Sequence, residues 1–318
     1  MELSVSQPKT SRYARGYLIC LCGTVMWSFT AIFISYLSRA YQLPALVLAF
    51  WRDIFVGFAL ALVFWIARPT LLRPGRPNLG FLVAYGLVLA LFNSLWTVSV
   101  VFNGAAVSTV LAYSSAAFTA VMGWQLYGEQ LGLRKITAVA LSIAGTVLVA
   151  GALDPAVWRL NPLGIVTGLL SGIAFAGYSL MGKASSQREI NPWTTLLYAF
   201  AFGAAFLLGM NLLDGVLPGD IASANLFWLG GALSGWLVLF SLAVIPTIGG
   251  YGLYTVSLGY LPVSVANLIA TLEPVLTAIW AFLLLGERLT ALQIFGSALI
   301  IIGVLLLRLQ PEPVVGKS

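Results

Sequence analysis

The chain has 318 residues, of which 60% are hydrophobic and 8% are charged, and its formal net charge is +6. Soluble globular proteins average about 25% charged residues, so this composition excludes a soluble protein. Apolar runs of roughly 20 residues recur along the whole chain, and each could cross a hydrocarbon core of about 30 Å as a helix. The runs lack the two-residue alternation of outer-membrane strands. The sequence therefore predicts an all-α integral membrane protein.

Ten transmembrane helices are expected, joined by short connections that often carry Pro or Gly. Their ranges are 17–37, 46–66, 79–101, 105–127, 134–151, 162–182, 193–213, 235–259, 263–285 and 291–308. The segment 214–235 fits either a surface helix or an early start of the eighth span. The first run is a full span long, so we interpret it as a retained helix and not as a cleaved signal.

The distribution of Lys and Arg predicts that both termini are cytoplasmic. With the N-terminus inside, only Arg39, Arg159 and Arg288 fall in outer connections. The basic residues that then fall inside are Lys9, Arg12, Arg15, Arg68, Arg73, Arg76, Arg134, Lys135, Lys183, Arg188, Arg308 and Lys317. This bias follows the positive-inside rule. Membrane topology thus accounts for the positive charge, and nucleic-acid binding is not expected.

The two halves of the chain contain related segments. When "VSTVLAYSSAAFTAVMGWQLYGEQL" (107–131) is aligned with "VSVANLIATLEPVLTAIWAFLLLGERL" on their "GE" pairs, Gly128 falls on Gly286 and Glu129 on Glu287. Each half holds five helices, and five is odd, so the halves enter the membrane in opposite directions. Many secondary transporters have such inverted repeats, with a substrate site near the midplane between the halves. A gene duplication without a transport role is the alternative.

The expected organisation has five parts. These are a cytoplasmic tail (1–15), a first five-helix repeat (16–151), a linker (152–161), a second five-helix repeat (162–308) and a second cytoplasmic tail (309–318).

The repeat, with its "GE-x-L" motif after an apolar run and a Gly-containing final helix, resembles the EamA-type branch of the drug/metabolite transporter superfamily. The segment "LEPVLTAIWAFLLLGERLTALQIFGSALIIIGVLLL" (272–307) carries the best match. In the first copy, Ala116 stands where the repeat expects a proline. The abundance of aromatic residues and the two-halves pattern make the aromatic amino-acid exporters of the YddG type the most similar sub-family. The resemblance implies the ten-helix fold and a transport function.

Glu273 and Pro274 lie in the interior of the expected ninth span. A charged side chain at the bilayer centre costs about 2.5–3.5 kcal/mol on insertion scales, so Glu273 should face protein or a water-filled cavity. It could couple transport to protons or bind a substrate ammonium group. The alternative is a structural or gating role, in which a polar neighbour satisfies the backbone carbonyl of Ala270 that Pro274 leaves unpaired.

Arg52 and Asp53 are further coupling or gating candidates near the start of the second span. Adjacent helical residues do not face each other, so each is expected to need a partner of its own. Arg52 could instead extend its long side chain to the outer interface. Arg52 is also the only basic residue in the interior of a span, which argues against phosphorylated substrates, because these need several cations.

Several aromatic and neutral polar residues fall toward the interiors of spans and not at their ends, where interfacial Trp and Tyr gather. We interpret them as an apolar cavity wall with polar groups, suited to a flat organic solute, although each alone could serve helix packing. The substrate-binding candidates are Trp27, Ser28, Asn93, Trp96, Tyr113, Ser114, Tyr178, Tyr251 and Tyr254.

The positions of glycine and proline residues predict a close helix contact on the sixth span and a hinge in the eighth. Gly164, Gly168 and Gly172 form a small-residue ladder that allows a close helix contact. Pro246, Gly249 and Gly250 in "IPTIGGYG" are expected to form a hinge in the eighth span.

These observations favour a bacterial inner-membrane exporter of small organic metabolites, above all aromatic or apolar amino acids, that works by alternating access. A multidrug or quaternary-cation exporter is the close alternative; a membrane-embedded enzyme or a passive pore is less favoured. The chain has no histidine and no clustered metal ligands, so neither a cofactor nor a metal is expected. The expected partners are a zwitterionic or apolar small molecule and the lipid bilayer, with no nucleic acid, and a monomer would suffice.

Overall fold

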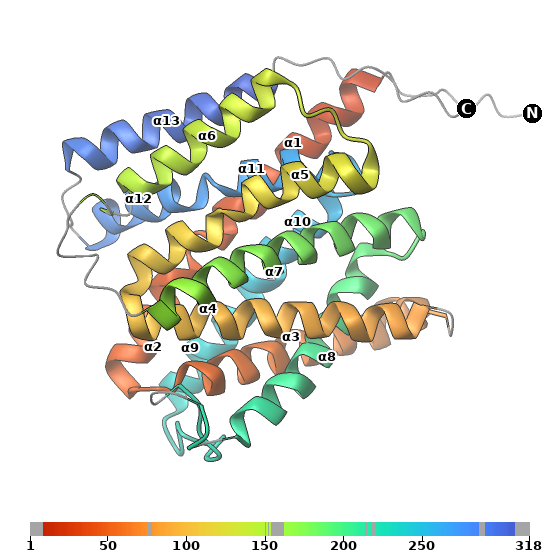
Figure 1. Cartoon of the computed structure of the whole chain (residues 1–318). Helices are drawn as coiled ribbons and strands as arrows, with labels where there is room; N and C mark the ends of the chain where they lie inside the picture. Colours follow the sequence, from red (N-terminus) through yellow and green to blue (C-terminus); the bar gives the residue numbers. More distant parts are fainter. Residues whose placement is uncertain are drawn as a thin grey trace, which may run out of the picture.

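The structure is a computed structural model that describes residues 9–75, 78–149, 151, 153, 162–213, 215–217, 221–285 and 290–308. These residues form helices and contain no strand (Figure 1). The elements are α1 (Lys9–Trp27), α2 (Thr30–Tyr41), α3 (Ala45–Ala67), η1 (Pro69–Leu72), α4 (Leu79–Tyr113), α5 (Ser115–Tyr127), α6 (Leu133–Val149), α7 (Pro162–Gln187), α8 (Pro192–Asn211), α9 (Leu233–Leu242), η4 (Ala243–Ile248), α10 (Gly249–Ser257), α11 (Val263–Ala270), α12 (Glu273–Leu285) and α13 (Ala291–Arg308).

Seven helical stretches of the described chain are long and apolar enough to cross a membrane. They are Tyr13–Tyr41, Ala45–Ala67, Leu79–Val100, Pro162–Gln187, Pro192–Asn211, Leu233–Ser257 and Val263–Trp280. The apolar helix Ala291–Leu306 is shorter. An all-helical membrane protein is therefore confirmed.

Three expected spans are interrupted and are not continuous helices as predicted. The first is divided at Ser28–Phe29, between α1 and α2, the fourth at Ser114, between α4 and α5, and the ninth at Thr271–Leu272, between α11 and α12. At the first break, the Ser28 hydroxyl donates to the carbonyl of Val25 over 2.7 Å. A Ser hydroxyl that bonds its own backbone competes with the helical hydrogen bonds, which favours an interruption there.

Helix α4 contains a sharp bend. Nine residues of straight α-helix rise about 13.5 Å, yet the Ser99 hydroxyl donates to the Ser108 hydroxyl over 2.8 Å. The helix must therefore fold back between these serines, and Figure 1 shows the chain reversing direction at the left end of the gold helix and continuing as a yellow helix at an angle to it. The expected spans 79–101 and 105–127 meet at this bend without a separate loop, and the second continues into α5 after Ser114.

The small-residue ladder of α7 packs against this returning part of α4. A methyl group at Gly168 would lie 2.6 Å from Cδ1 of Leu111, and one at Gly172 would lie 2.9 Å from the carbonyl oxygen of Leu111. The close helix contact predicted from the sequence is thus present, and α4 is the partner.

The segment before the eighth span forms turns. Described residues between 212 and 232 contain no helix, so neither a surface helix nor an early start of the span is found. Helix α9 begins at Leu233, and the span then passes through the π-helical segment η4, which contains Pro246.

Helices α6 and α13 lie side by side at one edge of the molecule (Figure 1), and their contacts are symmetric. The alignment of Gly128 with Gly286 shifts residue numbers by 158. Under this shift Gly145 becomes Gly303 and Ala138 becomes Gly296. A methyl group at Gly145 would meet the carbonyl of Gly296 at 2.5 Å, and one at Gly303 would meet the carbonyl of Ala138 at 2.8 Å. Each contact is the repeat image of the other, as at an interface between two related units.

Candidate functional site

The two interrupted spans that correspond in the repeat are broken at corresponding positions. Ser114 separates α4 from α5, and the numbering shift places it on Leu272, which lies between α11 and α12. The residues beside the breaks are in contact: Tyr113 ends α4, Glu273 begins α12, and the Tyr113 hydroxyl donates to Oε2 of Glu273. Interrupted spans at matching positions of two halves are a strong pointer to a transporter's binding site.

The structure changes the expected role of Pro274. This proline is the second residue of α12 and does not lie inside a continuous helix. The first helical turn has no partner for its N–H groups, so a proline costs little there. Helix α11 therefore ends before Pro274, at a turn formed by Thr271 and Leu272. The N–H groups of these two residues donate to the carbonyls of Leu268 and Ile269 over 3.1 and 3.0 Å.

A chain of buried polar side chains crosses the centre beside these breaks. The Ser115 hydroxyl donates to Oδ1 of Asn267 over 3.1 Å, and Nδ2 of Asn267 donates to the Ser179 hydroxyl over 3.3 Å. The Ser179 and Tyr254 hydroxyls lie 2.7 Å apart. The chain joins α5 to α11, α7 and α10, so a movement between the halves must rearrange it. Sequence reasoning selected Tyr254 but missed Asn267 and Ser179, because nothing in the sequence distinguishes these two from other polar residues in apolar runs.

An aromatic cluster surrounds the same centre and brings together several predicted residues. The Trp27 ring centroid lies 4.3 Å from that of Tyr251 and 5.7 Å from that of Tyr254. Tyr178 meets Tyr251 at 5.6 Å with perpendicular planes. Tyr113 belongs to the same buried core. Phe175 was missed by the sequence reasoning, although it lies 5.6 Å from Trp27, because its lack of a polar group made it indistinguishable from ordinary core residues.

Ser28 anchors α12 to the break between α1 and α2. The Trp280 indole N–H donates to the Ser28 hydroxyl over 2.8 Å, and the Thr277 hydroxyl donates to the Ser28 carbonyl over 3.1 Å. The break of the first span is thereby bound to the helix that follows the break of the ninth. Trp280 therefore has a partner for its N–H group, as a partly buried tryptophan requires.

The remaining predicted candidates lie on α4 or directly after its end. Asn93 is buried, and its Nδ2 atom has no hydrogen-bond partner within the described chain. Ser114 donates to the carbonyl of Leu111 over 2.5 Å. Trp96 is half-buried and is not part of the aromatic cluster.

The expectation for Arg52 and Asp53 was wrong. Both residues are buried, and Nε and Nη2 of Arg52 donate to Oδ1 of Asp53 over 3.1 and 3.0 Å. Their Cβ atoms point in different directions, but the arginine side chain is long enough to fold back onto its neighbour. Arg52 therefore does not extend to the interface. Oδ2 of Asp53 is buried without a partner in the described chain and faces Gly203 of α8.

The predicted hinge residues also serve close packing. A methyl group at Gly249 would collide with the Met26 side chain, and one at Gly250 would lie 3.0 Å from Cβ of Trp27. A larger side chain at either position would thus push α1 away from α10. Pro246 lies within η4, and π-helical segments occur often at functional sites.

No group of His, Cys, Asp and Glu side chains in the described chain could hold a metal ion. Cys20 and Cys22 are both free; Cys20 is buried and Cys22 is exposed. The arrangement is that of a buried centre with hydroxyl, amide and carboxyl groups among aromatic rings.

Comparisons with known proteins agree with this architecture. Residues 14–151 and 162–309 each match the EamA-like transporter family. A transporter of Synechocystis, itself uncharacterized, is 28% identical over 76% of this chain and 71% of its own length. An Escherichia coli protein named "Probable amino-acid metabolite efflux pump" is 26% identical over 90% of this chain and 92% of its own.

A solved crystal structure superposes with a TM-score of 0.72, covering 92% of this chain and 96% of the other. Its sequence identity is 17%, so this likeness concerns the fold alone. The two matched copies cover most of the sequence, and the homologues are named as transporters. The chain belongs to the EamA-like transporter family of the drug/metabolite transporter superfamily, and it is a multi-pass membrane transporter.

Proposed function

We propose that this protein exports small organic metabolites across the bacterial inner membrane, most of all aromatic or apolar amino acids, by alternating access. The contact between Tyr113 and Glu273 at the paired helix breaks carries the proposal. Each break belongs to a different copy of the family repeat. A substrate that broke the bond between Tyr113 and Glu273, or bound to either side chain in place of the other, would act on both halves at once.

The proposed topology has ten spans in two inverted five-helix repeats, with both termini in the cytoplasm. The symmetric contacts of α6 and α13 support the repeat, and so do the matching breaks. The Lys and Arg distribution supports the orientation. The organisation into tails, repeats 16–151 and 162–308, and linker 152–161 is proposed on the same grounds.

Two features support amino acids as substrates. The Escherichia coli relative is named as an amino-acid metabolite efflux pump, and the centre combines the ring surfaces of Trp27, Tyr251 and Tyr254 with hydroxyl, amide and carboxyl groups. An aromatic side chain could stack on such rings while its polar end bonds to the neighbouring groups. These features support the proposal that the protein is an aromatic amino-acid exporter of the YddG type.

The alternative function is export of lipophilic cations. It is favoured by the position of the Glu273 carboxyl group beside a core of aromatic rings, since ring faces attract cations. Purified protein in liposomes separates the two. We expect saturable, counter-substrate-stimulated flux of aromatic amino acids that exceeds the flux of quaternary ammonium ions. The reverse order would support the alternative, and unsaturable flux would indicate a pore.

The Glu273→Gln variant tests coupling in the same assay. If Glu273 carries the proton, this variant loses the dependence of flux on a pH gradient and keeps substrate exchange. Glu189→Gln is the control, because Glu189 is exposed at the turn between α7 and α8. Unchanged gradient dependence would assign Glu273 to structure or gating.

A further inference from the structure

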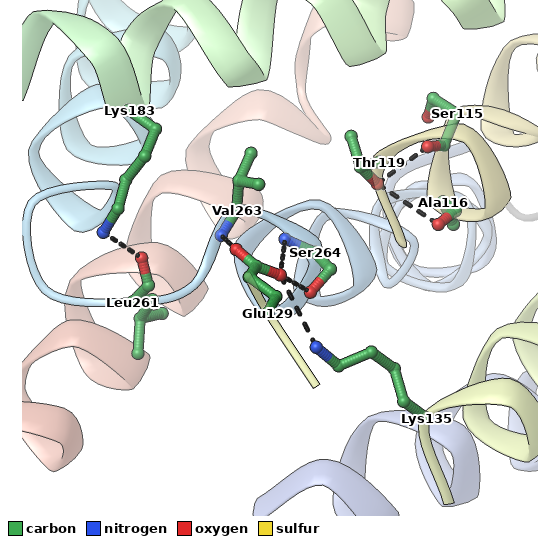
Figure 2. A network of polar contacts seen from close by, with 9 residues as sticks. All are labelled: Ser115, Ala116, Thr119, Glu129, Lys135, Lys183, Leu261, Val263 and Ser264. Carbon is green, nitrogen blue, oxygen red and sulfur yellow. Dashed lines mark hydrogen bonds and ion pairs between the residues drawn. The ribbon is translucent and has the colours of Figure 1, made fainter. Parts of the chain in front are cut away.

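Glu129 lies far from the paired breaks, at the end of the molecule where α5 finishes and α11 begins. Gly128 ends α5 with φ of 64°, a backbone conformation that favours glycine. The chain turns there, and the Glu129 N–H returns to the carbonyl of Gly123 over 3.2 Å. The side chain that follows this turn is directed onto α11, which belongs to the other half of the protein (Figure 2).

The Glu129 carboxylate caps the N-terminus of α11. Oε1 accepts the N–H of Val263 over 2.6 Å, and Oε2 accepts the N–H of Ser264 over 3.4 Å and the Ser264 hydroxyl. Lys135 of α6 lies 3.5 Å from Oε2. The carboxylate is 7% exposed, and the Lys135 side chain is 2% exposed. A negative charge at a helix N-terminus is favourable, and the first N–H groups of a helix need an acceptor.

The residue at the usual capping position cannot supply that acceptor. The N-cap of α11 is Pro262, which has no side-chain hydrogen bond, whereas helices commonly place Ser, Thr, Asp or Asn there. The N-terminus of α11 therefore depends on a carboxylate 134 residues away. A local cap would travel with its helix, but this one is present only while the two halves are in contact at this end.

The short connection before α11 is held at its other end by a positive charge. Lys183 of α7 donates to the carbonyls of Leu258 and Leu261 over 3.0 and 2.9 Å. Figure 2 shows Lys183 and Glu129 bound to neighbouring parts of this connection. The Lys183 cation thus lies at the C-terminal end of α10, and the Glu129 anion lies at the N-terminal end of α11. Each charge is opposite to the partial charge of the helix end that it contacts.

From this geometry we propose that Glu129 is a releasable latch, which closes this end of the transporter and opens once in each transport cycle. The proposal rests on the alternating-access function above. In the proposed topology this end is cytoplasmic, so the released N–H groups of α11 can bind water. The latch therefore holds the halves together, but the free-energy cost of separating them stays small enough for a transport cycle.

Cys20 provides a native reporter behind the latch. Its side chain is buried, and its thiol lies 3.6 Å from the carbonyl of Ala266, two residues beyond Ser264 in α11. The full chain would carry Cys22→Ser, which removes the exposed thiol. In detergent, the rate at which the charged reagent MTSET modifies Cys20 then measures opening of this end.

We expect Glu129→Gln to raise that rate about tenfold, because charge-assisted hydrogen bonds to α11 are lost and local opening becomes easier. Gly123→Ala should raise it several-fold without a change of charge, since the added methyl group would lie 2.9 Å from Oε2 of Glu129. Glu189→Gln, which removes an exposed charge at the turn between α7 and α8, should leave the rate unchanged.

Glu129→Gln also leaves Lys135 buried without its anion, so Glu129→Gln/Lys135→Gln separates this effect from the latch. A raised rate in the double variant supports the latch, and a native rate overturns it. If Glu129→Gln and Gly123→Ala both leave the rate of Cys20 modification at the native value, the latch is also overturned. If Glu129→Gln does not fold, the rate in Gly123→Ala alone is the test. Absence of flux in the native protein would instead refute the proposed function while leaving the labelling result intact.

Discussion

Two buried pairs of opposite charge are built in different ways. Arg52 and Asp53 are neighbours on α3, and both arginine donors reach Oδ1 while Oδ2 has no partner within the described chain. Glu129 and Lys135 approach α11 from the other half, and both oxygens of the glutamate have donors. The first pair depends on one cation, whereas the second carboxylate is bound mainly by a helix end.

This difference suggests different roles. A carboxylate whose oxygens are all bound adds cohesion between the parts that supply its donors. A buried carboxylate with an unbound oxygen is costly to keep, and such costs often mark functional positions. We therefore expect Glu129 to act by holding the two halves in contact. Asp53 stays a candidate for coupling transport to protons.

The largest effect is expected from Arg52→Leu. It leaves the Asp53 charge buried without its cation, which costs about 3–5 kcal/mol for a buried pair. Unfolding by SDS titration of the purified protein measures the loss. Arg52→Leu/Asp53→Leu removes both charges and should recover most of the stability. A double variant as unstable as the single one would show that packing, and not charge, is responsible.

Lys135→Met should cost less, about 1–2 kcal/mol, although Lys135 is more buried than Arg52. Glu129 keeps its donors from Val263 and Ser264 after the substitution. The same SDS titration measures the cost, with Arg134→Met as the control, because Arg134 is exposed on the same helix. A cost equal to that of Arg52→Leu would contradict the distinction between the two pairs.

Most helices of this fold could be predicted from the sequence, because apolar runs of full membrane length have a simple physical cause. The interruptions at Ser28–Phe29 and Thr271–Leu272 could not, since Ser and Thr also occur inside continuous helices, and the first break depends on the tertiary contacts of Thr277 and Trp280. The position of Pro274 indicated the second break only approximately.

The sequence indicated individual residues of the candidate site but not the contacts between them. Glu273 and Tyr113 each attract attention as polar groups within spans, but their contact joins residues 160 positions apart. The "GE" motif identified the repeat and gave no indication that Glu129 caps a distant helix. The partner of Arg52 was predicted wrongly, because the positions of Cβ atoms on a helix do not limit where a long side chain ends.

Gly203→Ala tests the unbound oxygen of Asp53. The methyl group would lie 3.2 Å from Oδ2 and would crowd a position that a proton donor could otherwise occupy. We expect a stability loss of about 1 kcal/mol by SDS titration, together with slower flux in liposomes. Gly209→Ala on the same helix meets nothing within 4 Å, so it should be neutral or slightly stabilising. Native flux in Gly203→Ala would show that Oδ2 has no part in transport.

The smallest effect is expected from Ser264→Ala. It removes one hydroxyl donor from Glu129, but the backbone N–H groups of Val263 and Ser264 remain, so the cost should be at most about 1 kcal/mol. Ser241→Ala is the control, because its hydroxyl bonds only the carbonyl of Leu237 on the exposed side of α9. A thermal shift assay in detergent resolves the two. If Ser264→Ala were as costly as Arg52→Leu, the hydroxyl would be the main support of the carboxylate, and the helix end would not hold Glu129 as the backbone geometry indicates.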